Sequence, residues 1–485
     1  MNTAVLQVDQ KRAPAGSFRE LLWVSIPLVI SSGTNGLMYV VDRVFLSWDS
    51  VDSMAAALPA GVLHWNLAAL ALGIVGYANA FVGQYEGAGD RHRIGPVLWQ
   101  GIYIAMATTA VIWIFVLPFA PQIFSFFGHD PAIQALELRY FKVMCWGTAP
   151  LLLSATLACF YSGRGQTTVI MVVDVIGSLV NVVLDYLLIF GNFGFPKMGI
   201  DGAAIATGTA FTSIVVMYLV VMVWTQRNSE YCLFSGWRFD RQLCAHFLRF
   251  GLPNGIQQFL DIACWTFFVQ VVGGLGKTEL SATGLLFNLN ALVFIPLIGL
   301  STAVMALTGQ RVGEGRPQLA VRTTWMAIGL ASIYVFVWCG IYLLLPEFIL
   351  RPYGLTENQG SLEQLVIFLL RFVAVYSLFD AMAVIFGSAI RGAGDTRFSL
   401  MFSVSSGVLV LVIPTYFASR EGPAGFTLAW YAVTAFVTVL GLGFLARFQQ
   451  GRWKSMRVIE HTAPELGHVP EAEPTAQSAP VATSS

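Results

Sequence analysis

Apolar residues form long runs along most of this chain, and each run has about the length of a membrane-spanning helix. Crossing about 30 Å of hydrocarbon takes about 20 helical residues. Twelve runs of that length are bounded by charged residues, glycine or proline, and each predicts one transmembrane helix. Their predicted limits are 20–48, 57–83, 96–118, 135–160, 167–191, 199–225, 247–274, 279–308, 319–345, 364–390, 398–418 and 424–448. The pattern predicts an all-α membrane protein.

The connections on one side of the predicted membrane are richer in Lys and Arg than those on the other. The odd-numbered connections contain only four such residues, whereas most of the 27 lie in the N-terminal arm, the even-numbered connections and the C-terminal tail. Because short cytoplasmic loops are enriched in positive charge, this asymmetry predicts that both termini are cytoplasmic. The first twenty residues lack the pattern of a cleaved signal, so none is expected.

The second half of the chain repeats landmarks of the first half at a nearly constant offset. Pro27, Gly83-Gln84 and Trp99 recur 226 residues later, and GRGQT at 163–167 recurs as GAGDT at 392–396. The recurring residues are Pro253, Gly309-Gln310 and Trp325. Six predicted helices in each half make a parallel repeat about an axis along the membrane normal, and transporters with such repeats bind substrate between the two halves.

This repeat divides the chain into two predicted bundles with flanking segments. The predicted parts are a cytoplasmic arm at 1–19, an N-terminal six-helix bundle at 20–225, a linker at 226–246, a C-terminal six-helix bundle at 247–450 and a disordered tail at 451–485. The tail is predicted to be disordered because it is rich in Pro, Ala, Glu and Ser. The glycine-rich stretches GQYEGAGD and GQRVGEGR are predicted to be cytoplasmic loops.

Composition narrows the possible partners. The chain is 56% hydrophobic and 11% charged, whereas soluble domains carry about 25% charged residues. Lys plus Arg number 27, and so do Asp plus Glu. Because the chain has no net charge, we expect no nucleic-acid partner. Its apolar surface is expected to contact membrane lipid. The six cysteines lack metal-binding spacing. We expect no cofactor, and we expect a monomer.

A few acidic residues lie inside the predicted helices, where an ionised carboxylate costs about 2.5 kcal/mol or more. Asp42, Asp185 and Thr207 are predicted at one depth, roughly 9–12 Å below the outer surface. Asp174, Asn181 and Asp185 share one helical face because they are seven and four residues apart. The pattern predicts an oxygen-rich cluster of Asp42, Asn181, Asp185 and Thr207, which suits Na⁺ or a proton.

The second half has two acids of its own, Asp261 and Asp380, both predicted near the membrane midplane. If they face each other, they form a second cation or proton site. Pro27 and Pro253 lie near the starts of their helices and are candidate hinges. A membrane aspartate can also merely hold helices together. Asp174 is predicted closer to the cytoplasmic third, where a solvated and a functional carboxylate are equally consistent with the sequence.

The chain resembles the multidrug and toxic compound extrusion (MATE) family of transporters. The resemblance is carried by SIPLVISSGTNGLMYVVDRVFLS, VGQYEGAGD, NVVLDYLLIFGNFGFPKMGIDGAAIAT, GLPNGIQQFLD and FDAMAVIFGSAIRGAGDT. It implies two six-helix bundles around a V-shaped central cavity. It also implies antiport, in which amphipathic and often cationic compounds are exported in exchange for H⁺ or Na⁺.

The resemblance also assigns site residues. The cation or proton site of the first bundle falls on Asp42, Asn181, Asp185, Thr207 and the Ala203 carbonyl. In the second bundle it falls on Asp261, where relatives often have Glu, and on Asp380. Asp174 stands where relatives more often have Asn, which makes it an additional candidate.

Two other classes of function agree less well with the sequence. A flippase for lipid-linked saccharides has a related fold but needs a cationic cavity, whereas the predicted mid-depth charges are aspartates. A channel or a membrane enzyme is disfavoured because the chain shows no ring of charge, no nucleophile with a paired base, and no histidine among the predicted buried polar residues. The sequence therefore favours an ion-coupled exporter in the inner membrane.

Overall fold

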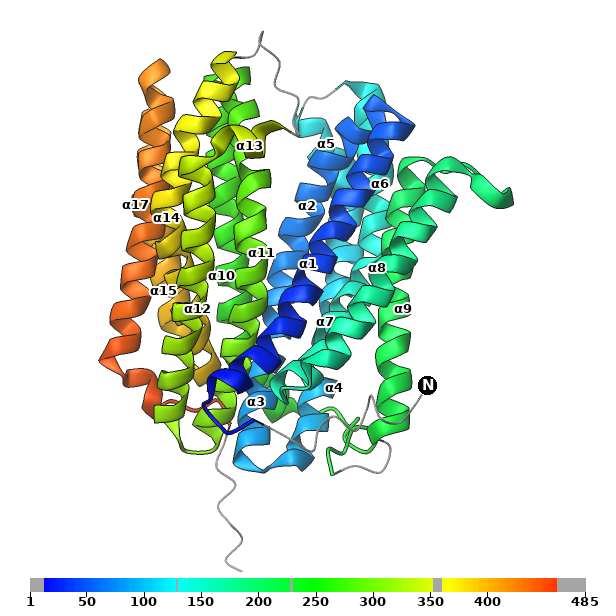
Figure 1. The fold of residues 1–485 in the computed structure, drawn as a ribbon. Coiled ribbons are helices and arrows are strands. Elements are labelled where there is room, and N and C mark those ends of the chain that lie inside the picture. Colours follow the sequence, from blue (N-terminus) through cyan, green and yellow to red (C-terminus); the bar gives the residue numbers. More distant parts are fainter. Residues whose placement is uncertain (1–12, 128–129, 227–229, 352–359, 460–485) are drawn as a thin grey trace, which may run out of the picture.

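The computed structural model describes residues 13–127, 130–226, 230–351 and 360–459. Within these ranges all regular structure is helical (Figure 1). The helices of the first half are α1 Phe18–Asp49, α2 Val51–Gly76, α3 Ala78–Ala88, α4 Ile94–Val111, α5 Ala120–Phe127, α6 Pro131–Trp146, α7 Thr148–Gly163, α8 Thr167–Phe190 and α9 Ile200–Gln226. Those of the second half are α10 Arg241–Leu275, α11 Lys277–Gly313, α12 Pro317–Leu344, α13 Pro346–Leu350, α14 Gly360–Ala393, α15 Thr396–Ser406, α16 Ile413–Ala418 and α17 Pro423–Gln450.

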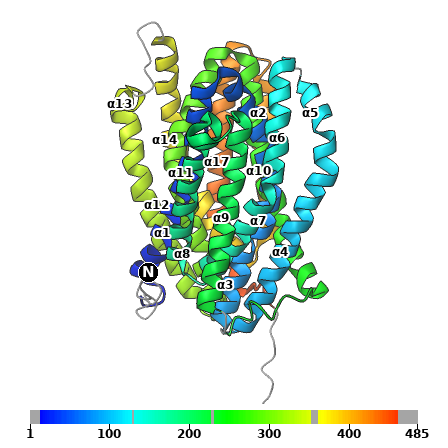
Figure 2. The same ribbon diagram turned by 90° about the vertical axis from the view of Figure 1, so that its right-hand side faces the viewer.

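The helices agree with the predicted membrane spans. Among the described residues, eleven helical stretches are long and apolar enough to cross a membrane. A twelfth span is formed by α6 and α7, which meet at a bend of 40°. Seen from the side of the first half, the helices run along a common axis (Figure 2). The prediction of an all-α membrane protein is confirmed.

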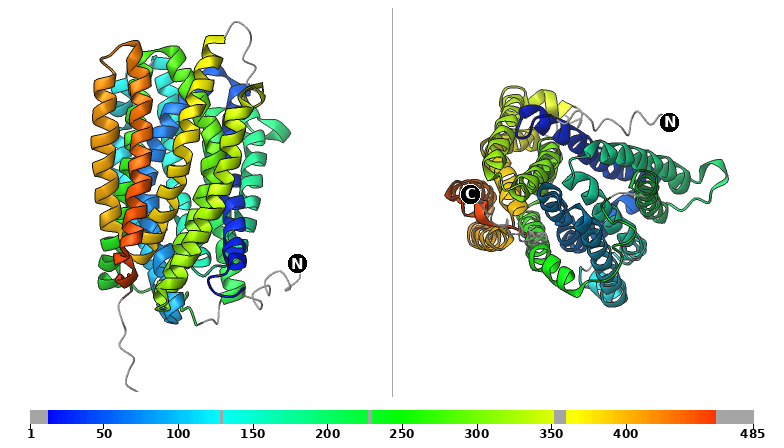
Figure 3. Two further views of the ribbon diagram at one scale, coloured as in Figure 1. Left: turned by 60° about the vertical axis from the view of Figure 1, so that its left-hand side comes forward. Right: turned by 90° about the horizontal axis from the view of Figure 1, so that it is seen from below.

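The helices gather into two groups that correspond to the two halves of the chain (Figure 3). In the first, α8 packs against α1 and α9, and in the second, α14 packs against α11 and α17. The groups meet where α1 and α3 pack against α11 and where α2 packs against α10. The described chain starts and finishes at one end of the molecule, which we call the terminal end (Figure 1).

Glycines allow the two bundles to touch at the terminal end. A Cβ added to Gly83 of α3 would lie 2.9 Å from the Ala306 carbonyl oxygen of α11, and one added to Gly309 would lie 3.3 Å from the Ala80 carbonyl oxygen. The prediction that GQYEGAGD and GQRVGEGR are loops is wrong in large part, because α3 continues to Ala88 and α11 to Gly313. Glycine inside a helix lowers the stability of the helix by about 1 kcal/mol relative to alanine. Here the close approach of the two helix backbones leaves no room for a larger residue than glycine.

Two glutamines of the repeat join the bundles through matching hydrogen bonds. The Gln84 side-chain amide donates to the Gly392 carbonyl oxygen at 2.9 Å, and the Gln310 amide donates to the Gly163 carbonyl oxygen at 2.7 Å. Both partners of each bond are landmarks of the sequence repeat. The repeat therefore produces a pseudo-two-fold pair of contacts, which we call the glutamine contacts.

The chain after α17 packs onto this same end. Trp453 is fully buried, and the Val458 N–H donates to the Gln84 side-chain oxygen at 2.7 Å. The segment 451–459 is therefore ordered, contrary to the prediction of a disordered tail from residue 451, because its apolar side chains have a surface to cover. The remainder of the predicted tail, 460–485, lies outside the described residues, as do residues 1–12 of the predicted arm.

Candidate ion-coupling site

Three adjacent helices position the predicted oxygen cluster of the first bundle. Asp42 lies on α1, Asn181 and Asp185 lie on α8, and Thr207 lies on α9. Because α8 packs between α1 and α9, the face of α8 that carries Asn181 and Asp185 meets both neighbours. All four residues are buried, with exposed fractions between 0% and 4%.

Hydrogen bonds connect these residues directly. The Thr207 hydroxyl lies 3.1 Å from Asp42 Oδ2 and 3.0 Å from the Ala203 carbonyl oxygen. With its amide nitrogen facing the acids, Asn181 donates to Asp42 Oδ1 at 3.0 Å and to Asp185 Oδ2 at 3.1 Å. The structure thus brings together Asp42, Asn181, Asp185, Thr207 and the Ala203 carbonyl.

The arrangement of the two carboxyl groups is suited to a proton or a small cation. They lie close enough to share a hydrogen bond when one of them is protonated. Two ionised carboxylates repel each other strongly in a dry interior, and one amide offsets only part of that repulsion. Asp185 Oδ1 is buried and has no protein partner in the described structure. A proton or Na⁺ bound there would satisfy this oxygen and neutralise part of the charge.

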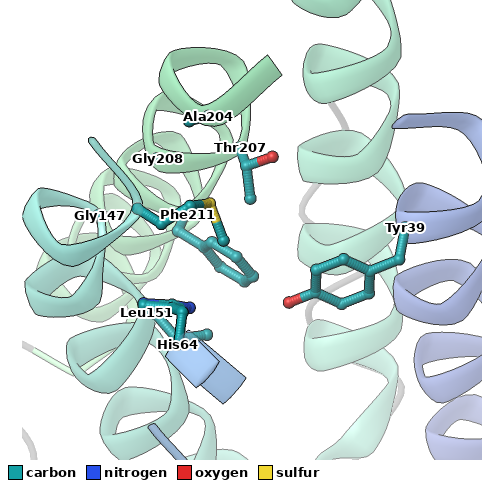
Figure 4. Close-up of a pocket in the computed structure, with 9 residues that line it drawn as sticks. Tyr39, His64, Gly147, Leu151, Ala204, Thr207, Gly208 and Phe211 are labelled. Atoms are coloured by element: carbon teal, nitrogen blue, oxygen red, sulfur yellow. The ribbon is translucent and has the colours of Figure 1, made fainter. Parts of the chain in front are cut away.

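A small cavity lies beside this cluster. Thr207 belongs to the cluster and also lines the cavity. The volume of the cavity is about 10 Å³, close to the lower limit for one water molecule. Figure 4 shows the Tyr39 ring pointing from α1 toward Phe211 of α9, with His64 on the same side as Leu151. Tyr39 could not be predicted at the site, because a single tyrosine flanked by apolar residues is typical of ordinary helix packing.

His64 is a buried polar residue that the sequence analysis missed. Its Nε2 lies 2.9 Å from the Thr148 hydroxyl, and only 4% of the residue is exposed. The expectation that no histidine belongs to the buried polar residues is therefore wrong. His64 lies inside the predicted helix 57–83, which could have indicated a residue within the membrane. The sequence of that helix does not show whether His64 faces the protein interior.

Asp174 is also buried, with an exposed fraction of 8%, so of the two alternatives left open by the sequence the solvated one is wrong. The Ser31 hydroxyl and the Asn35 amide donate to Oδ2, the latter at 3.4 Å, and the Tyr218 hydroxyl donates to Oδ1 at 3.5 Å. The aspartate therefore connects α8 to both α1 and α9. Its burial could not be predicted because its partners come from helices whose facing surfaces the sequence does not reveal.

Asp261 and Asp380 are both half-buried but are not brought into one site. In the described structure α10 packs chiefly against α2, α11 and α15, whereas α14 packs against α11, α12 and α17. Gln257 and Arg391 lie in the surroundings of Asp261, and Tyr376 in those of Asp380. Among the described residues no interaction joins Asp261 to Asp380. Pro27 and Pro253 lie inside the continuous helices α1 and α10.

The model of the MatE family matches the chain twice, over residues 27–187 and 253–417. The chain belongs to the MatE family. The two matches begin 226 residues apart, which is the offset of the repeat. The resemblance to MATE transporters is thus confirmed, and the chain is a transporter and not an enzyme.

Relatives of known name cover nearly the whole chain. Multidrug resistance protein PmpM of Pseudomonas aeruginosa is 28% identical over 440 residues, which are 88% of this chain and 90% of that protein. Multidrug resistance protein MdtK of Yersinia enterocolitica is 26% identical over 418 residues, which are 84% of this chain and 90% of that protein.

Solved structures of the family have the same fold. One, described as the outward-facing conformation of a multidrug resistance MATE family transporter of the MOP superfamily, superimposes with a TM-score of 0.81 at 20% identity. The superposition covers 92% of this chain and all of the other. The MATE fold predicted for the chain is therefore confirmed.

Proposed function

We propose that this MATE transporter is a secondary antiporter that exports amphipathic, cationic organic compounds in exchange for H⁺ or Na⁺. It acts as a monomer in the lipid of the cell inner membrane, with both termini and the terminal end in the cytoplasm. The observation that carries the proposal is the buried Asp42–Asp185 pair bridged by Asn181. The relatives named multidrug resistance proteins support export of varied drugs.

Ion binding at the pair neutralises charge that the dry interior disfavours. Asn181 can contact the pair in two ways, because rotation of its side-chain amide presents either the nitrogen or the oxygen to the carboxylates. With the nitrogen toward the acids it donates to both carboxylates, and with the oxygen toward them it supplies a further ligand for Na⁺. Thr207 and the Ala203 carbonyl supply the other oxygens.

The helix that carries Asp42 also contacts the other bundle, which connects ion binding to the arrangement of the two halves. A Cβ added to Gly36 of α1 would lie 2.8 Å from Ile295 Cδ1 of α11, and one added to Gly299 of α11 would lie 2.6 Å from Val29 Cα of α1. Such close packing transmits a small shift of α1 to α11. Pro27, buried within α1, is the candidate hinge for this shift, and Pro253 is its counterpart in α10.

Ion occupancy drives export only if the ion binds the two conformations with different affinity. In this mechanism the outward-facing conformation with a bound ion is favoured and releases the organic cation outside. Release of the ion into the cytoplasm then resets the cycle. Moving one charge through 100 mV provides about 2.3 kcal/mol, enough for about fifty-fold accumulation of a neutral solute. For a monovalent organic cation exchanged one for one the electrical contributions cancel, so the concentration gradient of the coupling ion drives export.

The charge of the interior favours cationic substrates over the alternative of lipid-linked saccharides. In the second bundle Asp380 adds a half-buried acid, and Asp261 adds another whose charge Arg391 partly offsets. A pyrophosphate-linked lipid requires basic side chains in the binding space. The clustered acids of the first bundle therefore support an exporter of organic cations.

Transport in proteoliposomes tests the proposal, with Na⁺ and pH gradients imposed separately and tetraphenylphosphonium as the organic cation. Uphill movement of the cation under one of these gradients, with no movement when both are collapsed, supports ion-driven antiport. Translocation of a lipid-linked oligosaccharide without movement of the cation would establish the flippase instead.

A further inference from the structure

Polar residues form a registered stripe along the contact between α1 and α8. The two helices are packed together, and Ser31 contacts Asp174 while Asp42 lies beside Asp185. Both pairs are 143 residues apart, so the helices run in the same direction in constant register. The same offset defines two intermediate positions, and the four pairs are Ser31/Asp174, Asn35/Ser178, Met38/Asn181 and Asp42/Asp185.

The stripe has two acidic ends. Eleven residues separate the ends on each helix, which corresponds to about 16 Å along the axis. The outer end is the Asp42–Asp185 pair. The inner end, nearer the terminal end, is Asp174 with its donors Ser31, Asn35 and Tyr218.

The inner carboxylate has no counter-charge. Its three donors are neutral hydroxyl and amide groups, and no basic side chain contacts it in the part of the chain that the structure describes. A buried ionised carboxylate that is offset only by neutral donors remains costly. A proton or a cation at this position would remove that cost.

Two unpartnered oxygens indicate where such a ligand would lie. The Asn35 side-chain oxygen and the Ser178 hydroxyl are both buried without a hydrogen-bond partner among the described residues. Ser178 is 6% exposed, and it lies on the same face of α8 as Asp174, one turn farther along. The register pairs Asn35 with Ser178. Buried polar groups are nearly always satisfied, so these two oxygens point to a ligand between them.

We propose that Asp174, Ser31, Asn35, Ser178 and Tyr218 form an inner station for the coupling ion, between the outer carboxylate pair and the cytoplasm. The inference rests on the proposed antiport. The five side chains offer oxygens that suit Na⁺ or a proton carried by water. Ser178 of the inner station and Asn181 of the outer cluster are three residues apart on α8, so the two stations adjoin and the ion travels along the contact between α1 and α8.

A purely structural Asp174, which only ties α1 to α8, is the competing interpretation. The two interpretations differ in which mode of transport a substitution affects. Ion-driven uphill transport requires the ion to pass from the outer pair to the cytoplasm. Exchange of substrate across the membrane without any ion gradient does not require that passage. Loss of a structural tie would impair both modes together.

The experiment compares these two modes for Asp174→Asn in proteoliposomes with radiolabelled tetraphenylphosphonium and the membrane potential clamped at zero. Imposed Na⁺ and pH gradients drive uphill transport, and internal unlabelled cation drives exchange. We expect uphill transport to fall about tenfold, equivalent to about 1.4 kcal/mol in the barrier, and exchange to stay within about twofold of wild type. Asp174→Glu, which keeps a carboxylate, should restore most of the uphill rate.

Ser178→Ala provides an independent variant that keeps the fold. Its hydroxyl has no protein partner, so its removal should not lower the thermal stability. We expect it to slow uphill transport severalfold and to leave exchange unchanged. Exposed Ser47→Ala on α1, whose hydroxyl bonds only its own helix, should leave both modes unchanged.

The inference is overturned if the Asp174→Asn and Ser178→Ala variants both transport the cation uphill at the wild-type rate. It is also overturned if each substitution lowers the uphill rate and the exchange rate by the same factor. Absence of gradient-driven transport in the wild-type protein would instead overturn the proposed function itself. The wild-type measurement therefore separates failure of the inner station from failure of antiport.

Discussion

The glutamine contacts at the terminal end should hold this end closed, and they differ in strength. Gln84 donates to the Gly392 carbonyl and accepts from the Val458 N–H, whereas Gln310 donates to the Gly163 carbonyl. An average hydrogen bond contributes about 1 kcal/mol net. Gln84→Ala loses these two bonds together with their longer branches, to the Ala393 carbonyl at 3.3 Å and from the Ile459 N–H at 3.4 Å. Counting each branched bond once, it should favour the open terminal end by about 2 kcal/mol, or about thirtyfold.

The companion variant Gln310→Ala loses one such bond and should shift the same equilibrium by about 1 kcal/mol, or about fivefold. The difference follows because only Gln84 also contacts the segment after α17. Exposed Gln122→Ala on α5 serves as the matched control and should produce no shift.

Hydrogen–deuterium exchange of the purified protein measures this equilibrium. Opening of the terminal end exposes the amides of α3 and of the last turn of α14, so their exchange rates should rise by the factors given above. Amides of α17 away from that end should not change. Unaltered exchange of α3 in Gln84→Ala, or a larger effect in Gln310→Ala, would refute the assignment of closure to these bonds.

Three further variants test the coupling site and the contact between bundles. Thr207→Val removes a hydroxyl that donates to Asp42 at 3.1 Å and that would supply a ligand oxygen to Na⁺. Its loss should raise the half-saturating Na⁺ concentration of transport about fivefold, but it should tighten proton binding, because the ionised carboxylate loses a donor; titrations of transport with Na⁺ and with pH measure the two effects. Gly299→Ala places a methyl group 2.6 Å from Val29 Cα; thermal melting in detergent should show destabilisation by about 1–3 kcal/mol. Asp261→Asn should weaken export of tetraphenylphosphonium or alter its ion dependence, and transport with separate Na⁺ and pH gradients would detect either change.

Spacing within single helices allowed much of the first-bundle cluster to be predicted. Asn181 and Asp185 share a helical face by their separation alone, and depth estimates placed Asp42 and Thr207 at the same level. These two constraints suffice because a buried membrane acid must find a polar partner. The number of spans followed from apolar length, and the repeat predicted the two bundles.

Contacts between helices could not be predicted in the same way. The donors to Asp174 lie on α1 and α9, and apolar sequences do not reveal which faces of two helices meet. GQYEGAGD falls between two predicted spans, which favours a loop, and local propensity also disfavours glycine in helices. Close packing of α3 on α11 outweighs that propensity. His64 was missed for the related reason that its partner Thr148 lies on another helix.

Asp42→Asn tests the central claim most directly, because it keeps the size of the side chain and removes one of the two paired charges. The variant should insert in the membrane and remain folded, since an amide can still bond Thr207. Gradient-driven export of tetraphenylphosphonium from proteoliposomes should be lost or strongly reduced under both Na⁺ and pH gradients. Export at the wild-type rate with unchanged ion dependence would show that the Asp42–Asp185 pair does not couple ion movement to transport.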